Sequence, residues 1–191
     1  FRPIWQARLV IWRCCRRRDP RRMNKGPGRP VGDTALDEFE TIRLEVDSHV
    51  ATVTIMRPPV NAQNNKFRDE LVEVIDHLGD RPDVRAIILT GDGKAFSSGA
   101  DLSERPTQAP GCYTHHNRRV RSSFDCLLEC QKPVIAAVNG AAVGAGCVTA
   151  LCCDIIIASE NAFLQMPEVN VGLAGGVSHV RRHFSESDAR L

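Results

Sequence analysis

Two short turns built from small residues can do chemistry through their backbone. Gly99–Ala100–Asp101 follows an apolar run at residues 84–90, and Gly144–Ala145–Gly146 follows another at residues 133–138. Small side chains let a ligand approach the main chain closely, and the second turn opens a helical segment whose first N–H groups have no partner inside the helix. Two such turns can aim N–H donors at one oxygen, which is the design of an oxyanion hole. Close packing of helix on strand is the other explanation, and the residues alone leave both open.

Alternating strands and helices must position these turns. A β-rich hairpin is expected at residues 41–56 with its turn at 47–49, and a helix at 66–80 with Phe67, Leu71, Val74, Ile75 and Leu78 on one face. The later elements expected are a strand at 84–90, a polar loop at 91–104, a mobile surface segment at 103–116, a helix at 117–131, a strand at 133–138, a helix at 143–152 and strands at 154–159 and 162–166. This order predicts an α/β fold with a largely parallel sheet. Ligands of such folds lie beyond the carboxyl ends of the strands, where both turns fall.

Charge divides the chain into two parts. Residues 1–31 hold ten Lys or Arg and a single acid, Asp19, so the remaining chain carries a net charge of about −7. We expect a disordered basic tail at 1–37 and a folded domain at 38–191. The tail has three interpretations: translated sequence upstream of a start at Met23, an organelle targeting segment, or a basic arm for nucleic acid or acidic lipid. The first is favoured, and no nucleic-acid or membrane partner is predicted.

Bulk composition limits the class of protein. The 191 residues are 42% hydrophobic and 25% charged, as in ordinary globular proteins. No apolar run reaches the roughly 18–20 residues of a membrane span. The eight cysteines form no C-x-x-C pair, so a zinc site is not expected. Buried thiols of a reducing compartment explain them instead, which predicts a cytoplasmic protein, or a mitochondrial one if the basic tail is a transit peptide.

Four segments together resemble the enoyl-CoA hydratase/isomerase superfamily, the crotonase-like proteins. They are "LTGDGKAFSSGADL", "KPVIAAVNGAAVGAGC", "CCDIIIASENAFLQMPEVNVGL" and "GGVSHVRRHF". The resemblance covers about residues 41–191. It implies a spiral of ββα units, an acyl-CoA thioester substrate and an enolate held by two backbone N–H groups. It implies neither a metal nor a cofactor other than the coenzyme A of the substrate.

The resemblance also assigns residues. The backbone donors are Ala100 and Ala145, and the acid is Glu168, in "MPEVNVGL". The residues that it implies in substrate binding are Gly99, Asp101, Gly144, Gly146, Ala62 and Lys94. His115 and His116 lie in the segment that borders the acyl pocket of relatives, where solvent exposure is the simpler expectation. The full-length protein is expected to form a homotrimer or hexamer.

Two departures from the family shape the functional prediction. Hydratases of the family commonly use two glutamates, and the first of these positions is Val148 here. One carboxylate can take a proton from one carbon and return it to another, whereas addition of water is easier with two groups. A single Glu168 therefore favours double-bond isomerisation over hydration. A non-catalytic acyl-CoA-binding protein is the alternative.

Length is the second departure. The family usually continues for several helices beyond "VRRHF", whereas this chain stops at Leu191. We therefore expect a truncated crotonase-like core, a fragment that lacks the C-terminal helices.

Overall fold

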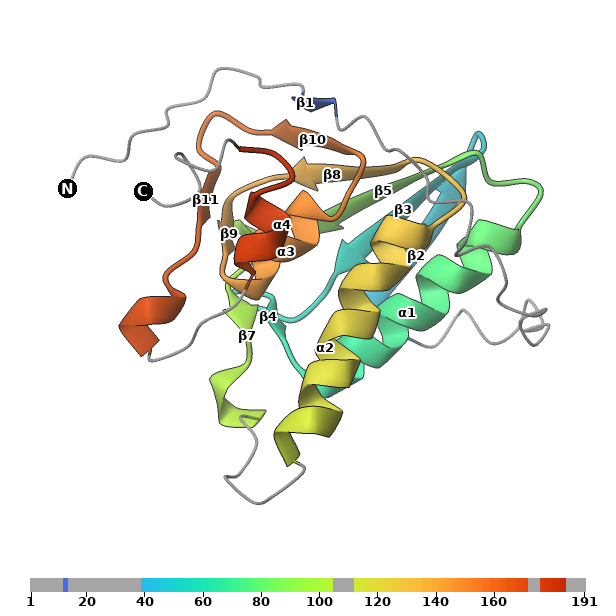
Figure 1. The fold of residues 1–191 in the computed structure, drawn as a ribbon. Coiled ribbons are helices and arrows are strands. Elements are labelled where there is room, and N and C mark those ends of the chain that lie inside the picture. The colour runs from blue at the N-terminus through green and yellow to red at the C-terminus, as the bar shows by residue number, and fades with distance from the viewer. Residues whose placement is uncertain (1–11, 14–38, 105–111, 172–175, 185–191) are drawn as a thin grey trace.

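A six-stranded sheet forms the framework of the molecule. The structure is a computed structural model that describes residues 12–13, 39–104, 112–171 and 176–184. The strands lie in the order β1-β10-β8-β5-β3-β2 (Figure 1). In that order they are Trp12–Arg13, Ile155–Ala158, Val134–Val138, Ala86–Gly91, Val50–Ile55 and Ile42–Asp47. The four inner strands are parallel and both edge strands are antiparallel to their neighbours, so the predicted α/β fold is confirmed.

Burial explains why the apolar runs became inner strands. Val53, Leu89 and Val134 are completely buried, as central strands of a parallel sheet require. The predicted hairpin forms as β2 and β3, and its turn residues Ser48 and His49 both have positive φ, which matches the twist of the strands. The apolar runs of the sequence therefore supply the core.

Two long helices cover this framework. α1 (Asn65–Asp80) and α2 (Cys112–Glu129) lie side by side in Figure 1. The Asn64 side chain caps α1 by accepting a 2.9 Å hydrogen bond from the Phe67 N–H, which satisfies one free donor of the first turn. The five apolar residues expected on one face of α1 are all buried, which confirms that prediction.

Short strands build a second, smaller layer. β6 (Ala95–Ser97), β9 (Ala141–Val143) and β11 (Phe163–Gln165) form a three-stranded sheet, and β4 (Ala62–Gln63) pairs with β7 (Gly99–Ala100). Two short helices follow the strands of this layer, namely α3 (Ala145–Leu151) and α4 (Val177–Val180), with 3-10 turns η3 (Leu102–Glu104) and η4 (Glu168–Val171). This layer carries both backbone turns.

The sequence placed some boundaries wrongly. Residues 91–104 were expected to be loop but contain β6 and β7, because strands of two or three residues show no periodicity. α3 begins at Ala145 rather than at 143, because residues 141–143 pair as β9. α2 begins at Cys112, so residues 112–116 are helical and not part of a mobile segment. The prolines and glycines before residue 112 led the sequence prediction to end the mobile segment too late in the chain.

The predicted basic tail lies almost wholly outside the described residues. Trp12–Arg13 alone is described, as the edge strand β1 beside Ile155–Ile156, where neither strand nor sheet contact was expected. The prediction of disorder for the rest of residues 1–37 stays a prediction, as does the division at residue 38.

Gly140 and Gly79 give a matched test of this packing. A Cβ on Gly140 would lie 2.0 Å from the backbone oxygen of Lys94, whereas a Cβ on Gly79, inside α1, would meet nothing within 4 Å. Gly140→Ala should therefore lower the free energy of unfolding by about 2 kcal/mol or more. Gly79→Ala should raise it by up to about 1 kcal/mol. Denaturant unfolding of both variants checks this, and an unchanged midpoint for Gly140→Ala would contradict the close approach.

Candidate active site

The two backbone turns meet in the structure. A Cβ built on Gly99 would lie 2.5 Å from the Val143 oxygen and 3.1 Å from the Ala145 nitrogen, so β7 lies directly against the start of α3. Gly99 has φ +93°, a conformation that favours glycine. The sequence could not decide between a ligand site and close packing, and the geometry shows that close packing is one role of Gly99.

The N–H groups of Ala100 and Ala145 have different surroundings. Ala145 is the first residue of α3, and no acceptor for its N–H is found among the described residues. In the β4–β7 pair, the Asp101 N–H donates to the Gln63 oxygen over 3.1 Å. N–H groups alternate in direction along a strand, so the Ala100 N–H points away from β4. The Ala100 N–H is therefore not used in the pairing of β7 with β4.

Glu168 reaches the same turn from η4. A Cβ on Gly144 would lie 3.0 Å from Oε1 of Glu168, and Gly144 has φ +53°, so no larger residue fits there without strain. The Gly144 N–H donates to the Gln165 oxygen over 2.8 Å, which ties α3 to β11 just before Glu168. The carboxylate and the Ala145 N–H thus flank one glycine.

The Glu168 carboxylate is incompletely paired. Its Oε2 is buried and has no hydrogen-bond partner among the described residues. Burial, and after it the negative charge of Glu168, raise the pKa of the neighbouring Cys147 thiol to about 12. A buried carboxylate oxygen without a donor costs stability, so its position suits contact with a ligand.

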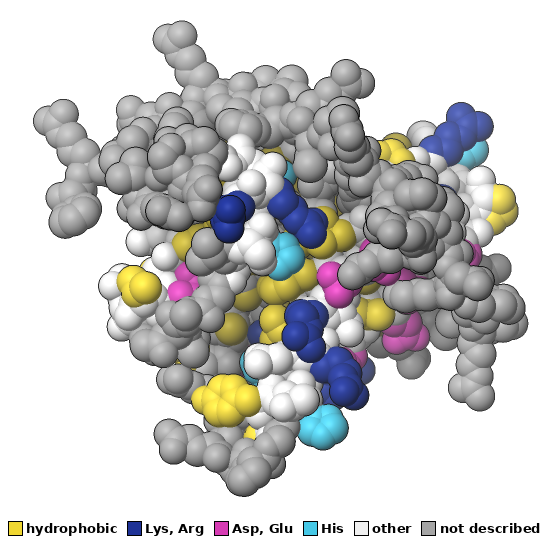
Figure 2. Space-filling model, in the orientation of Figure 1, with side chains coloured by type: hydrophobic (Ala, Val, Ile, Leu, Met, Phe, Trp, Pro, Cys, Tyr) yellow, Lys and Arg dark blue, Asp and Glu magenta, His cyan; other side chains and the backbone are white. Residues whose placement is uncertain are grey.

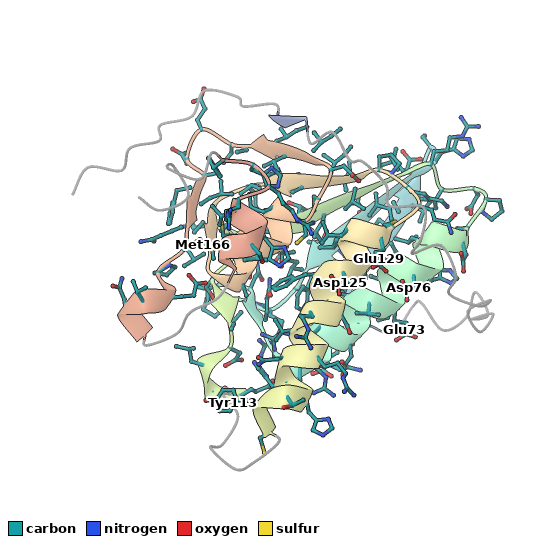
Figure 3. All side chains as sticks on the ribbon, in the orientation of Figure 1. Glu73, Asp76, Tyr113, Asp125, Glu129 and Met166 are labelled. Atoms are coloured by element: carbon teal, nitrogen blue, oxygen red, sulfur yellow. The ribbon has the colours of Figure 1, made fainter. Side chains whose placement is uncertain are left out.

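Val148 closes the site with apolar atoms. Its side chain is 2% exposed. A Cβ on Gly176 would lie 2.8 Å from Cγ2 of Val148 and 2.3 Å from Cε of Met166. Met166 lies beside α3 and α4 in Figure 3. The position where family hydratases carry an acid is therefore packed inside the protein.

A polar network that the sequence reasoning did not single out holds β4 and β7 in place. Asn61 is completely buried with φ +54°, and its amide donates to the oxygens of Asp92 and Ala95 over 2.9 Å and 2.8 Å. The Ser97 hydroxyl donates to the Asn61 oxygen over 2.7 Å and accepts from the Gly99 N–H over 3.2 Å. Short polar residues between strands were the one signal that could have identified this network.

Arg57 joins the same two strands. Its guanidinium contacts the Ala62 carbonyl oxygen and lies 3.2 Å from the Asp101 carboxylate. The Ser103 hydroxyl first, and Arg57 as well, hold the pKa of Asp101 below its usual value. Asp101 and Ala62 are thus engaged with neighbouring residues of the protein.

Gly146 and Lys94 are the other two predicted binding residues. Gly146 packs on β6, since a Cβ there would lie 2.4 Å from the Ser97 oxygen. Lys94 is exposed in the turn before β6, at the opposite end of that strand from Ala100. The structure therefore brings together Gly99, Ala100, Gly144, Ala145 and Glu168, with Ala62 and Asp101 beside them, and leaves Lys94 outside this group.

Comparison with known proteins identifies the family. The family model for enoyl-CoA hydratase/isomerase matches residues 45–189. The chain belongs to the enoyl-CoA hydratase/isomerase family. A short-chain-enoyl-CoA hydratase of Clostridium acetobutylicum is 41% identical over 151 residues, which cover 76% of this chain and 56% of that protein. A probable enoyl-CoA hydratase of Bacillus subtilis is 35% identical over 148 residues, covering 75% of this chain and 56% of that protein.

A solved structure supports the same assignment. Pseudomonas aeruginosa DspI matches with a TM-score of 0.78 and 33% identity, over 83% of this chain and 62% of that one. This chain thus has the crotonase-like α/β fold that the motifs predicted. The chain spans just over half the length of the curated relatives it matches.

Neither a metal centre nor a membrane-spanning helix is found in the part of the chain that the structure describes. Among residues 12–13, 39–104, 112–171 and 176–184, His, Cys, Asp and Glu do not gather in threes that could hold a metal ion. Within the same part of the chain, every helix is too short or too polar to cross a membrane.

Cys147 can report on the charge of Glu168. Because a nearby negative charge disfavours the thiolate, Glu168→Gln should lower the pKa of Cys147 and speed its alkylation at a fixed alkaline pH. Peptide-resolved mass spectrometry after timed alkylation measures this rate. Cys126 is the internal control, because burial raises its pKa and Glu168 is not among the causes. An equal gain at both thiols would indicate general loosening and contradict the specific contact.

Proposed function

We propose that this protein moves a double bond within an enoyl-CoA thioester. The supporting observation is the buried, unpartnered Oε2 of Glu168 beside the turn that carries the free Ala145 N–H. In the proposed complex the thioester oxygen accepts hydrogen bonds from Ala100 and Ala145. Negative charge develops on that oxygen in the enolate, and fixed donors at that point lower the barrier.

Glu168 is the single acid/base in this proposal. With a 3-enoyl thioester, its carboxylate takes a proton from C2, and the electron pair of that bond spreads over the dienolate and its oxygen. The protonated carboxyl then gives the proton to C4, which leaves the double bond between C2 and C3. One group both takes and returns the proton, so no second acid is needed.

Val148 argues against hydration as the main reaction. Water addition is helped by a second group that activates the water or protonates the carbon. Val148 is 2% exposed and apolar, so it can neither activate water nor protonate a carbon. The names of the relatives include hydratases, and hydration is therefore the second candidate activity.

The remaining proposals concern substrate, assembly and location. Coenzyme A enters as part of the substrate, and the exposed Lys94 is proposed to meet its phosphates. The exposed apolar side chains of Phe163 and Leu164 on β11, with Val169 at 80% exposure, support a homotrimer or hexamer as the assembled form. Buried thiols such as Cys126 and Cys147 favour a reducing location, proposed to be cytoplasmic or mitochondrial.

A substrate panel tests the type of reaction. Matched 3-enoyl-CoA and 2-enoyl-CoA thioesters are offered to the protein, and the double-bond shift and water addition are followed by product analysis. Isomerisation should exceed hydration by about 10²-fold or more, the scale of one missing proton-transfer group. Efficient hydration of a crotonyl-type thioester would refute this preference.

Glu168→Gln tests the acid/base assignment. Turnover should fall by about 10²–10⁴-fold, because the amide cannot take the proton. Thioester binding, measured by calorimetry, should stay nearly the same, because both backbone donors remain. Glu160→Gln is the matched control, since this exposed acid lies in the turn between β10 and β11 and should keep full activity. Full activity of Glu168→Gln would exclude Glu168, and thioester binding without turnover in the unaltered protein would favour a non-catalytic acyl-CoA-binding role.

A further inference from the structure

A cavity of about 520 Å³ lies at the N-terminal end of α2. Asn65 of α1, Glu104 of η3 and the N-terminal half of α2 line it. The residues that α2 contributes are Cys112, His115, His116, Arg118 and Arg119. Figure 2 shows basic side chains and histidine gathered over this half of α2. The proposed proton transfer uses none of these groups.

The lining carries an excess of positive charge. Two arginines, Arg118 and Arg119, face one acid, Glu104, whose Oε2 already accepts a 2.7 Å hydrogen bond from the Asn65 N–H. Arg119 lies 2.9 Å from Asp69 at the exposed rim. Burial first, and then the positive charges of Arg68 and Arg119, lower the pKa of His116. The lining of the cavity therefore has more cationic side chains than acidic ones.

Arg68 adds a buried charge close to the cavity residues Glu104, His116 and Arg119. Its side chain is 2% exposed, and its Nε has no hydrogen-bond partner among the described residues. Arg68 lies one turn after Asn65 on α1, so the two residues share a face of the helix. Oδ1 of Asn65 is also buried without a partner, and rotation of this amide would present its NH₂ group instead. A buried guanidinium is costly unless anions compensate it, and Glu104, Asp101 and Asp69 supply part of that compensation for Arg68.

The charge order along α2 opposes helix stability. A helix favours acids in its first turns and bases in its last. α2 has no acid in its first turn and no base in its last, and its N-terminal half carries the cavity's histidines and arginines. Asp125 and Glu129 lie toward its C-terminal end (Figure 3). The positive end of the helix dipole thus adds to the positive side chains at the cavity. This arrangement favours an anionic ligand but destabilises the helix itself.

The cavity is within reach of the proposed reacting centre. Glu104 follows Ala100 by four residues through η3, a span of roughly 10 Å at the rise of a 3-10 helix. On the other side, Gln63 pairs with Ala100, and Asn65 follows two residues later. We propose that the acyl group of the substrate extends into this cavity and ends in an anionic group, a carboxylate, that its arginines and histidines bind. This inference rests on the proposed function, because it names the class of thioester that the same site accepts.

Coenzyme A phosphates are the other anions that such a cavity could hold. The exposed cation placed for them, Lys94, lies at the far end of β6 from Ala100, whereas the cavity lies beyond Ala100 on the side of η3. A thioester extends in two directions from its carbonyl carbon. The cavity and Lys94 therefore suit the two opposite arms of one substrate.

Binding of unreactive thioesters tests this without turnover. Dissociation constants are measured by calorimetry for two matched pairs, adipoyl-CoA with hexanoyl-CoA and suberoyl-CoA with octanoyl-CoA. The carboxylate member of at least one pair should bind about tenfold more tightly, the scale of one charge-assisted hydrogen bond. Arg118→Gln should reduce this ratio to below about threefold. Arg121→Gln is the matched control, because this exposed arginine is also on α2 but does not line the cavity, and should leave the ratio unchanged.

Each other outcome overturns the inference in a distinct way. Equal affinity within both pairs would refute carboxylate recognition and leave the proposed function standing. No binding by any of the four thioesters would refute the proposed function and this inference together. If Arg118→Gln weakens hexanoyl-CoA as much as adipoyl-CoA, the cavity binds the coenzyme phosphates and the assignment to the acyl end is wrong.

Discussion

The site depends on direct backbone-to-backbone packing at glycine residues. β7 can lie against the start of α3 because Gly99 has no Cβ, since one would lie 2.5 Å from the Val143 oxygen. The same absence lets Gly146 pack on Ser97 and Gly140 on Lys94. Side chains at these positions would separate β6 and β7 from β9 and α3, and the N–H groups of Ala100 and Ala145 would move apart. Packing and a role in ligand binding are therefore two consequences of one requirement.

The unsatisfied polar atoms gather near the proposed chemistry. Three of the four such atoms among the described residues belong to this region, namely Oε2 of Glu168, Nε of Arg68 and Oδ1 of Asn65, and the fourth is Nε2 of His77 in the last turn of α1. Each such atom costs stability in the free protein. Glu168 lies against the backbone turn, and Arg68 and Asn65 lie at the neighbouring cavity. A substrate with a reactive carbon near the first and an anionic end near the others would relieve these costs on binding.

Buried hydrogen bonds tie the short strands of this layer to one another and to α3. Asn61 and Ser97 tie β4 to β6 and β7 through buried hydrogen bonds, and Arg57 bridges to Asp101. Gln63 donates to the Thr149 hydroxyl over 2.9 Å, and that hydroxyl donates to the Ala145 oxygen, which fixes α3 to the same layer. A network of this kind holds backbone donors in place before a ligand arrives, which is what electrostatic stabilisation of an enolate requires.

The sequence alone determined those strands and helices whose apolar residues form a pattern over several positions. The apolar runs of β5 and β8, the hairpin of β2 and β3 and the buried face of α1 follow from patterns repeated over several residues. Motifs in the same chain also marked Ala100, Ala145 and Glu168 and implied the family. Tertiary structure alone decided the two-residue pairing of β4 with β7, the partners of Arg57 and Asn61, and the start of α2 at Cys112. It also decided that the charged side chain of Arg68 on α1 is buried. These features depend on which distant segments meet, and short strands or single polar residues carry no local signal of their partners.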